Sequence, residues 1–362
     1  MSILFTPLKI GSISVPNRFV RSATHEYMAD DEGNVTDNEV ELYRRLAEGE
    51  VGLIISGHAF VQPSGKASPR QTAVYDDRFV EGLARIPAAV HGYSSLVFLQ
   101  IAHAGRQTKE RLCACVPVSP SAVYDPVSKV MPRELRGEEI RALITDFVAA
   151  AGRAKRAGFD GVQLHAAHGY LISSFLSPHT NRRTDEWGGP VEKRARVLID
   201  VLRGAKAACG TAFPVIVKLN STDFLDGGLT VDDAVRIARM LEAEGIDAIE
   251  VSGGMAEAGR GSVWPGLRSE ADEGYFAENA ARIKKAVQVP VFALGGIRTL
   301  AVAEKIVEEG RADLISLSRP LIRDPYLVKH FREGLTTKSE CISCNKCFYP
   351  RGIRCAELTK KR

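Results

Sequence analysis

Short apolar segments recur along the chain, and each is followed by a longer segment with helical periodicity. Branched and aliphatic residues fill most positions of the short segments, which is typical of strands covered by helices on both faces of a parallel sheet. The candidate strands are Arg18–Ser22, Gly52–Ser56, Leu96–Ile101, Gly161–His165, Val215–Leu219, Ala248–Ser252, Val291–Leu294 and Leu314–Ser318. Eight such units predict an α/β fold of the (β/α)8 TIM-barrel class.

The helical segments lie between these strands and support the same architecture. They are Asn38–Glu48, Asp77–Val90, Gly137–Ala157, Pro190–Ala208, Thr230–Glu244, Asn279–Ala286 and Leu300–Glu309. Several end at a glycine shortly before the next strand, because glycine adopts the left-handed conformation that ends a helix. A doubly wound sheet is the alternative, but no Gly-x-Gly-x-x-Gly motif follows any candidate strand.

Two connections are longer than the others. Thr108–Arg136 follows the third candidate strand, and Leu171–Gly189 follows the fourth. Long loops on a barrel usually build or cover the mouth of the active site. We therefore expect both segments at that mouth.

The composition excludes several classes of protein. The chain has 362 residues, 45% hydrophobic and 25% charged, and its 48 basic and 44 acidic residues give a net charge of +4. The basic residues are scattered, so we expect no nucleic-acid partner. No apolar run approaches the roughly 18 residues of a membrane span, and the first residues lack the order of a secretory signal. We expect a cytoplasmic protein with no membrane partner.

Polar residues stand at the ends of the predicted strands, where a barrel places its active site. They are Ser22, Thr24, Ser56, Gly57, His58, Gln100, His103, His165, Lys218, Asn220, Ser252, Gly253, Gly295, Gly296, Ser318 and Arg319. This ring has few carboxylates, so it suits an anionic or electron-rich ligand better than a hard cation. A zinc site at His165 and His168 is disfavoured, because no third ligand follows at a suitable spacing.

Four motifs together resemble the old yellow enzyme family. They are Asn17-Arg18-Phe19-Val20, His103-Ala104-Gly105-Arg106, His-Ala-Ala-His-Gly-Tyr-Leu from residue 165, and Ser-Pro-x-x-Asn-x-Arg-x-Asp-x-x-Gly-Gly from residue 177. The resemblance extends from Leu4 to about Asp324. It implies an FMN-dependent ene-reductase on a (β/α)8 barrel, in which hydride passes from flavin N5 to the β-carbon of an α,β-unsaturated carbonyl compound.

The resemblance also implies roles for the catalytic residues. His165 and His168 match the donor pair that binds the substrate oxygen, where each donor is typically worth about 2.7–4 kcal/mol. Tyr170 matches the proton donor to the α-carbon, and such a general acid contributes roughly 10²–10⁴-fold. Tyr27 is expected to face the substrate. The alternative is a hydrogen-bonded structural histidine with Tyr170 as a packing residue, which the family context disfavours.

The flavin contacts follow from the same resemblance, position by position. Lys218 matches the cation beside flavin N1 and O2, and His25 stands where the family commonly has Thr or Cys. A histidine there could donate a hydrogen bond to the flavin or titrate near neutral pH. The glycine pair and Ser318-Arg319 lie where many barrels bind phosphate. The expected cofactor-binding residues are Ser22, Ala23, Thr24, His25, Gly57, His58, Gln100, His165, Lys218, Gly295, Gly296, Ser318 and Arg319.

The end of the sequence carries a group of cysteines. We divide the chain into an FMN-binding barrel, residues 1–335, and a Cys-rich tail, residues 336–362, with Cys341, Cys344, Cys347 and Cys355. The tail resembles the [4Fe–4S] segment of 2,4-dienoyl-CoA reductase and trimethylamine dehydrogenase, although the spacing after the second cysteine differs. Four thiolates could bind iron–sulfur or zinc, and a tail of reduced, metal-free thiols is the alternative.

These observations predict an enzyme with small-molecule partners. NAD(P)H would reduce FMN and leave, and an activated alkene would replace it in a ping-pong reaction; we also expect a homo-oligomer. One alternative is an enzyme like 2,4-dienoyl-CoA reductase or an amine dehydrogenase. Another is a flavin or iron–sulfur electron-transfer component that acts with a partner protein. A phosphate-binding aldolase or isomerase barrel is disfavoured, because no lysine–carboxylate pair stands out.

Overall fold

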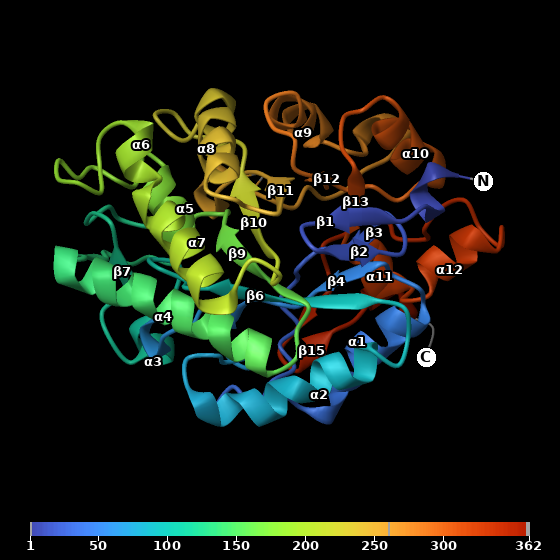
Figure 1. The fold of residues 1–362 in the computed structure, drawn as a ribbon, viewed down its shortest axis with the longest axis horizontal. Helices are drawn as coiled ribbons and strands as arrows, with labels where there is room; N and C mark the ends of the chain where they lie inside the picture. The colour runs from blue at the N-terminus through green and yellow to red at the C-terminus, as the bar shows by residue number, and fades with distance from the viewer. Residues whose placement is uncertain (1, 260, 360–362) are drawn as a thin grey trace.

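Eight parallel strands close into a barrel in the computed structural model, which describes residues 2–259 and 261–359 (Figure 1). In barrel order the strands are β3 (Phe19–Arg21), β4 (Leu53–Ile55), β6 (Leu96–Ala102), β9 (Gly161–Ala166), β10 (Val215–Asn220), β11 (Ala248–Ser252), β12 (Val291–Ala293) and β13 (Leu314–Leu317). The pairing of β13 with β3 completes the ring. The predicted (β/α)8 barrel is confirmed.

Helices surround the barrel. The larger ones are α1 (Asp37–Glu48), α2 (Val80–Val90), α4 (Gly137–Arg156), α7 (Arg196–Cys209), α8 (Val231–Ala243), α9 (Ala277–Lys284) and α10 (Leu300–Glu308). Short helices α11 (Arg319–Arg323) and α12 (Leu327–Arg332) follow the last barrel strand. Thr36 and Thr230 begin α1 and α8 by accepting hydrogen bonds from backbone N–H groups of the first turn.

Two elements differ from the sequence prediction. The helix predicted at Pro190–Ala208 is divided at Ala195 into α6 (Val191–Arg194) and α7. An antiparallel hairpin, β1 (Leu8–Ile10) and β2 (Ile13–Val15), was not predicted. Ile10 and Val15 of this hairpin belong to an apolar cluster with inward-facing strand residues, so they fill the N-terminal end of the barrel.

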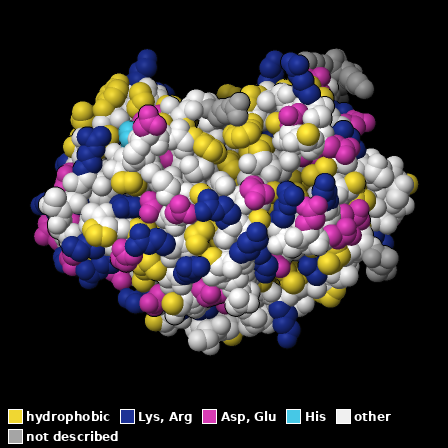
Figure 2. Space-filling view, turned by 90° about the horizontal axis from the view of Figure 1, so that it is seen from above, with side chains coloured by type: hydrophobic (Ala, Val, Ile, Leu, Met, Phe, Trp, Pro, Cys, Tyr) yellow, Lys and Arg dark blue, Asp and Glu magenta, His cyan; other side chains and the backbone are white. Residues whose placement is uncertain are grey.

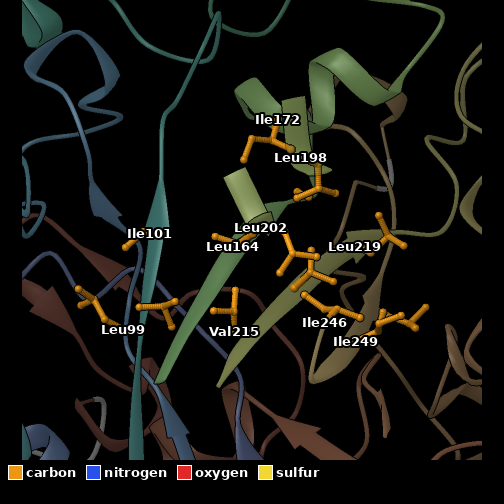
Figure 3. Packing of buried hydrophobic residues seen from close by; sticks show 14 of the residues in the cluster. Leu99, Ile101, Leu164, Ile172, Leu198, Leu202, Val215, Leu219, Ile246 and Ile249 are labelled. Carbon is orange, nitrogen blue, oxygen red and sulfur yellow. The ribbon is translucent and has the colours of Figure 1, made fainter. Parts of the chain in front are cut away.

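Alternation along each strand separates the packing face from the functional face. In β10, Val215, Val217 and Leu219 belong to the large apolar core. Ile216 and Lys218 alternate with them and therefore point to the opposite face of the strand. Figure 3 shows Leu164, Val215 and Leu219 beside Leu198 and Leu202 of α7. The apolar contacts therefore lie between strands and helices, and the barrel interior remains for polar residues at its C-terminal end.

Smaller elements complete the fold. They are β5 (Ala59–Phe60), α3 (Glu110–Cys113), β7 (Val118–Ser119), β8 (Arg133–Glu134), α5 (Leu171–Leu176), β14 (Phe348–Tyr349), β15 (Gly352–Ile353) and α13 (Ala356–Thr359). Lys and Arg are interspersed with Asp and Glu on the face seen in Figure 2. Across 2–259 and 261–359, no helix is both long and apolar enough to span a bilayer.

The segment after α12 runs back over the loops at the C-terminal ends of the strands. Backbone hydrogen bonds join Thr337 to Leu300 and Ser343 to Gly266. Cys347 and Ile353 pack against Ile322 of α11. The division between barrel and tail at 335/336 stays a prediction, and residues 360–362 of the predicted tail lie outside the described residues.

Candidate active site

A cavity of about 380 Å³ opens at the C-terminal ends of the barrel strands. Its size falls within the usual range of small-molecule pockets. The expected site residues that line it are Ser22, Ala23, Thr24, His25, Tyr27, His58, Gln100, His165, His168, Tyr170, Lys218, Gly295, Gly296, Ser318 and Arg319. The fold therefore brings together side chains that are far apart in the sequence.

The end of β9 and the turn after it carry two histidines and a tyrosine. His165 lies in the strand, and the positive φ angles of His168 (64°) and Gly169 (83°) form the turn that precedes Tyr170. The backbone N–H of His168 donates to Asn220 Oδ1 at 3.1 Å, which supports this conformation. The ring of His165 lies 5.3 Å from that of His168 and 4.7 Å from that of Tyr170.

Both imidazoles are neutral near neutral pH. Burial lowers the pKa of His165 well below its ordinary value and lowers the pKa of His168 to about 3. His165 Nδ1 accepts from the backbone N–H of Ala167 at 3.3 Å, so the ring proton belongs on Nε2. His168 Nε2 lies 2.7 Å from Ser252 Oγ. The pair can therefore offer hydrogen bonds to a ligand oxygen without carrying charge.

A buried ion pair forms the floor of the cavity. Lys218 Nζ lies 3.3 Å from Glu250 Oε2 and donates to Ser22 Oγ at 2.8 Å. Ser22 Oγ in turn donates to Glu250 Oε1 at 2.7 Å. Because a lone buried charge is unfavourable, the lysine and the carboxylate compensate each other in the barrel interior.

Amide side chains extend this network toward β6. Gln163 Nε2 donates to Glu250 Oε2 at 2.9 Å, and Gln100 Nε2 donates to Gln163 Oε1 at 2.6 Å. The sequence analysis missed Glu250 and Gln163. The available signal was a single polar residue in the middle of an otherwise apolar strand: Glu250 in Ala-Ile-Glu-Val-Ser and Gln163 in Gly-Val-Gln-Leu-His.

Another wall of the cavity is formed by the backbone of Gly295 and Gly296 and by the buried side chain of Arg319. Gly295 and Gly296 have φ angles of +124° and +73°, and a β-carbon on Gly296 would collide with Leu267. Glycine is therefore required where this chain turns against its neighbours. Arg319 Nη1 donates to Trp264 O at 2.9 Å and to Asn345 Oδ1 at 2.6 Å, which holds the guanidinium at the cavity.

The protonation of His25 differs from what the sequence analysis expected. Its ring packs 3.7 Å from that of Tyr27 and 4.8 Å from that of His58, and its Nε2 is hydrogen-bonded to Ser68 Oγ. Burial, and then the neighbouring His58, lower the pKa of His25 well below its ordinary value. The expectation that it could titrate near neutral pH is therefore wrong, and the ring is neutral there.

Among the expected cofactor-binding residues, all of which the structure describes, Gly57 alone does not line the cavity. Its N–H donates to Tyr43 Oη at 3.0 Å, and the Glu26 carboxyl group occupies the space where a side chain would point. This glycine is needed for packing behind the cavity wall.

The two long connections were also assigned wrongly. In the described structure neither 108–136 nor 171–189 contributes to the cavity lining, because the two segments pack on each other. Arg183 Nη1, for example, donates to the carbonyl oxygens of Pro120 at 2.9 Å and Leu135 at 2.7 Å. The outer wall comes instead from Ala67, Ser68, Ala256, Ser262, Val263, Tyr275 and Phe348.

The four tail cysteines lie near one another, and no disulfide joins them in the described structure. Burial raises the pKa of Cys347 to about 11, and Cys341, Cys344 and Cys355 add to this effect. Among the described residues, no three His, Cys, Asp or Glu side chains are arranged to hold a metal ion. A metal at these cysteines stays a prediction.

The chain is similar to known proteins over most of its length. The sequence model of the NADH:flavin oxidoreductase / NADH oxidase family matches residues 3–338. An NADH oxidase of Thermoanaerobacter brockii is 40% identical over 345 residues, which are 94% of this chain and 52% of that protein.

Two solved structures share the fold. A 2-naphthoyl-CoA reductase, solved in complex with 2-naphthoyl-CoA, superposes with a TM-score of 0.89 at 34% identity over 95% of this chain and 54% of its own. An old yellow enzyme homologue from Zymomonas mobilis gives a TM-score of 0.83 at 29% identity over 98% and 97% of the two chains. The chain thus spans about half the length of the NADH oxidase and of the 2-naphthoyl-CoA reductase.

Proposed function

This chain belongs to the NADH:flavin oxidoreductase / NADH oxidase family, which is also the family of the old yellow enzymes, and we propose that it is an ene-reductase. In this proposal it uses FMN and NAD(P)H to reduce the C=C bond of α,β-unsaturated carbonyl compounds. The observation that carries the proposal is the convergence of two neutral imidazoles and a tyrosine hydroxyl in one cavity whose floor is a buried lysine.

The donor set of the cavity fits FMN. Lys218 supplies a cation and Gln100 an amide at the floor, where the polar edge of an isoalloxazine ring would lie. Gly295, Gly296 and Arg319 line the other wall, where backbone N–H groups and a guanidinium would hold the phosphate. Bound FMN would supply the hydride that reduces the alkene, after receiving one from the nicotinamide nucleotide.

The histidine pair would bind the carbonyl oxygen of the substrate. Negative charge grows on this oxygen when hydride reaches the β-carbon, so a donor aimed at it stabilises the transition state more than the ground state. Each such donor is typically worth about 2.7–4 kcal/mol. His165 and His168 are neutral, so they donate hydrogen bonds and keep their protons.

Tyr170 would complete the reduction with a proton. Burial raises the pKa of its hydroxyl group above the ordinary value, with a further contribution from Tyr27. The phenol therefore stays protonated until the α-carbon becomes basic enough to take the proton. Hydride on the β-carbon and a proton on the α-carbon together account for the saturated product.

A second candidate function is electron transfer to another redox centre. One observation favours it: Phe348, which directly follows Cys347, lines the cavity. The tail cysteines therefore lie near the proposed flavin site, as a relay would require. In this case the carbonyl-binding residues would not be needed for turnover.

Separate measurement of the two half-reactions tests the proposal. NADH or NADPH should bleach the flavin absorbance of the purified holoenzyme in the absence of oxygen, and 2-cyclohexenone should restore it. Bleaching without recovery by any enone would contradict ene-reduction and favour electron transfer. A holoenzyme that neither nucleotide reduces would contradict both candidates.

A further inference from the structure

A chain of hydrogen bonds leads from Gln71 through His58 to Tyr170. Gln71 Nε2 lies 2.7 Å from His58 Nδ1, and His58 Nε2 lies 3.2 Å from Tyr170 Oη. Gln71 and His58 are buried, at 1% and 8% exposure. The rings of His58 and Tyr170 meet edge to face, with their centroids 5.2 Å apart. The contact joins two residues that are distant in sequence, and the tyrosine is the proposed proton donor.

The hydrogen bonds of Gln71 fix the orientation of its amide group. Its Oε1 accepts from the backbone N–H of Ala67 at 2.7 Å, and its Nε2 also donates to the carbonyl oxygen of His58 at 3.0 Å. A flipped amide would set N–H against N–H at one end and oxygen against oxygen at the other. The NH2 group therefore faces His58 Nδ1, and this nitrogen has to be the acceptor.

The tautomer of His58 follows from this constraint. A neutral imidazole carries one proton, and an accepting Nδ1 leaves that proton on Nε2. Burial lowers the pKa of His58 to about 4, so the ring is neutral near neutral pH. The other ionisable side chains that interact with the pair are His25, His165, His168, Lys218 and Tyr27, and none of them is a carboxylic acid.

The direction of the last hydrogen bond is then determined. His58 Nε2–H donates to the phenol oxygen of Tyr170, which acts as acceptor. The hydrogen of the phenol is not used in this contact and is free to point into the cavity. When that proton leaves, the same N–H faces a phenolate, and a hydrogen bond to a charged oxygen is roughly twice as strong as a neutral one.

We propose that His58 is a positioning residue for proton transfer, which holds Tyr170 through Nε2–H so that the phenol donates its proton into the cavity and the resulting phenolate is stabilised. This role rests on the proposed function, because it requires Tyr170 to be the proton donor. It differs from the flavin contact expected of His58, which would act on both half-reactions.

Two matched variants separate these roles. The amide nitrogen of Gln in His58→Gln can reach the place of Nε2, whereas the shorter side chain in His58→Asn reaches only that of Nδ1. Holoenzyme reoxidation by 2-cyclohexenone should be about tenfold to a hundredfold slower in His58→Asn than in His58→Gln. The rate of flavin reduction by NAD(P)H should differ little between the two variants, because both lose the imidazole from the cavity wall. Equal slowing of both half-reactions in His58→Asn relative to His58→Gln, or equal reoxidation rates in the two variants, would overturn the proposal.

Coupling to Tyr170 provides the second readout. His58→Asn should cause no further slowing in a Tyr170→Phe background, because the contact is already lost there. Additive effects would show that His58 acts independently of Tyr170. If Tyr170→Phe alone left reoxidation unchanged, the proposed function would lose its proton donor, and the role of His58 would be lost with it.

The tautomer can be measured without turnover. In the ¹⁵N-histidine-labelled holoenzyme, the His58 signals, assigned by their loss in His58→Gln, should show a pyridine-like Nδ1 and a pyrrole-like Nε2. A pyrrole-like Nδ1 would overturn this inference and leave ene-reduction untouched. This measurement therefore distinguishes failure of the inference from failure of the proposed function.

Discussion

Single residues at inward strand positions decide what the cavity can bind. Parallel register sets Lys218 of β10 beside Glu250 of β11 and beside His165 of β9. A cation, its counter-charge and a neutral donor therefore lie in one layer of the barrel. Their positions at strand ends made Lys218 and His165 recognisable in the sequence. Glu250 was visible as a polar residue within an apolar strand, but its pairing with Lys218 depends on strand register, which a single sequence does not reveal.

The ion pair at the cavity floor has a measurable cost when one partner is removed. Glu250→Gln keeps the size of the side chain but leaves Lys218 buried without a counter-charge. Breaking a buried pair in this way typically costs about 3–5 kcal/mol, and we expect that loss in the free energy of unfolding measured with urea. Adding Lys218→Met should recover part of it. Unchanged stability of Glu250→Gln would show that the lysine does not need the carboxylate.

Tyr170 should affect only one half of the catalytic cycle. Tyr170→Phe removes the hydroxyl group and should slow enone-driven reoxidation of the flavin by roughly 10²–10⁴-fold, while reduction by NAD(P)H stays nearly intact. Stopped-flow absorbance under anaerobic conditions measures both steps. Tyr75→Phe, which lies outside the cavity lining, serves as the control. Equal slowing of the two steps would contradict the assignment as proton donor.

Elements were predicted best where their pattern is local. The strand Val215–Asn220 and the helix Val231–Ala243 follow from an apolar run and from a capped amphipathic segment. The hairpin Leu8–Val15 was missed because its short alternating strands do not resemble strands buried on both faces. The division near Ala195 was missed because it depends on a distant contact: Arg194 Nε donates to the carbonyl oxygen of Leu176 at 2.7 Å.

Two buried carboxyl groups, Glu26 after β3 and Glu39 in α1, should make stability depend on pH. Burial raises the pKa of Glu26 to about 8 and that of Glu39 to about 7. Glu39 Oε1 accepts from Thr72 Oγ1 at 2.7 Å. Both groups ionise near pH 4.5 in the unfolded chain, so the unfolded state loses these protons first as the pH rises. The free energy of unfolding should therefore fall between about pH 5 and 8.

Substitution of one carboxyl group tests whether the free energy of unfolding falls as the pH rises. The amide introduced by Glu39→Gln cannot ionise. The decrease in the free energy of unfolding from pH 5 to 8 should therefore be smaller, by about 1.4 kcal/mol for each unit by which folding raises the pKa of Glu39. Urea unfolding from pH 5 to 8 provides the measurement, with the exposed Glu81→Gln on α2 as control. A decrease of the same steepness in Glu39→Gln would show that this group is not protonated in the folded protein.

At the scale of the whole molecule, closure of the barrel collects eight strand ends at one cavity. Eight recurring units in the sequence were sufficient to predict this closure. The covering of the cavity was not predictable from loop length, since its outer wall comes from residues such as Ser68, Val263 and Phe348. Their positions depend on how the loop after β5, the loop after β11 and the tail pack over the barrel.

The predicted metal at the tail can be tested on the whole protein. If the four thiols bind a metal, protein purified without oxygen should contain iron with acid-labile sulfide, or zinc, in stoichiometric amounts. Cys347→Ser should lose this metal, because binding requires the thiolates together. Cys209→Ser, which changes a buried cysteine of α7, should retain it. A metal-free wild-type protein would make the tail a purely structural segment.

The central claim is that His165 and His168 bind a ligand oxygen over the flavin, and titration of the oxidised holoenzyme with a para-substituted phenol tests it directly. The oxygen of a phenol would accept hydrogen bonds as the carbonyl oxygen of a substrate would, and a change in flavin absorbance would report binding. His165→Ala should weaken phenol binding by about tenfold or more, because it removes one hydrogen bond to the oxygen. An unchanged phenol affinity would contradict the account.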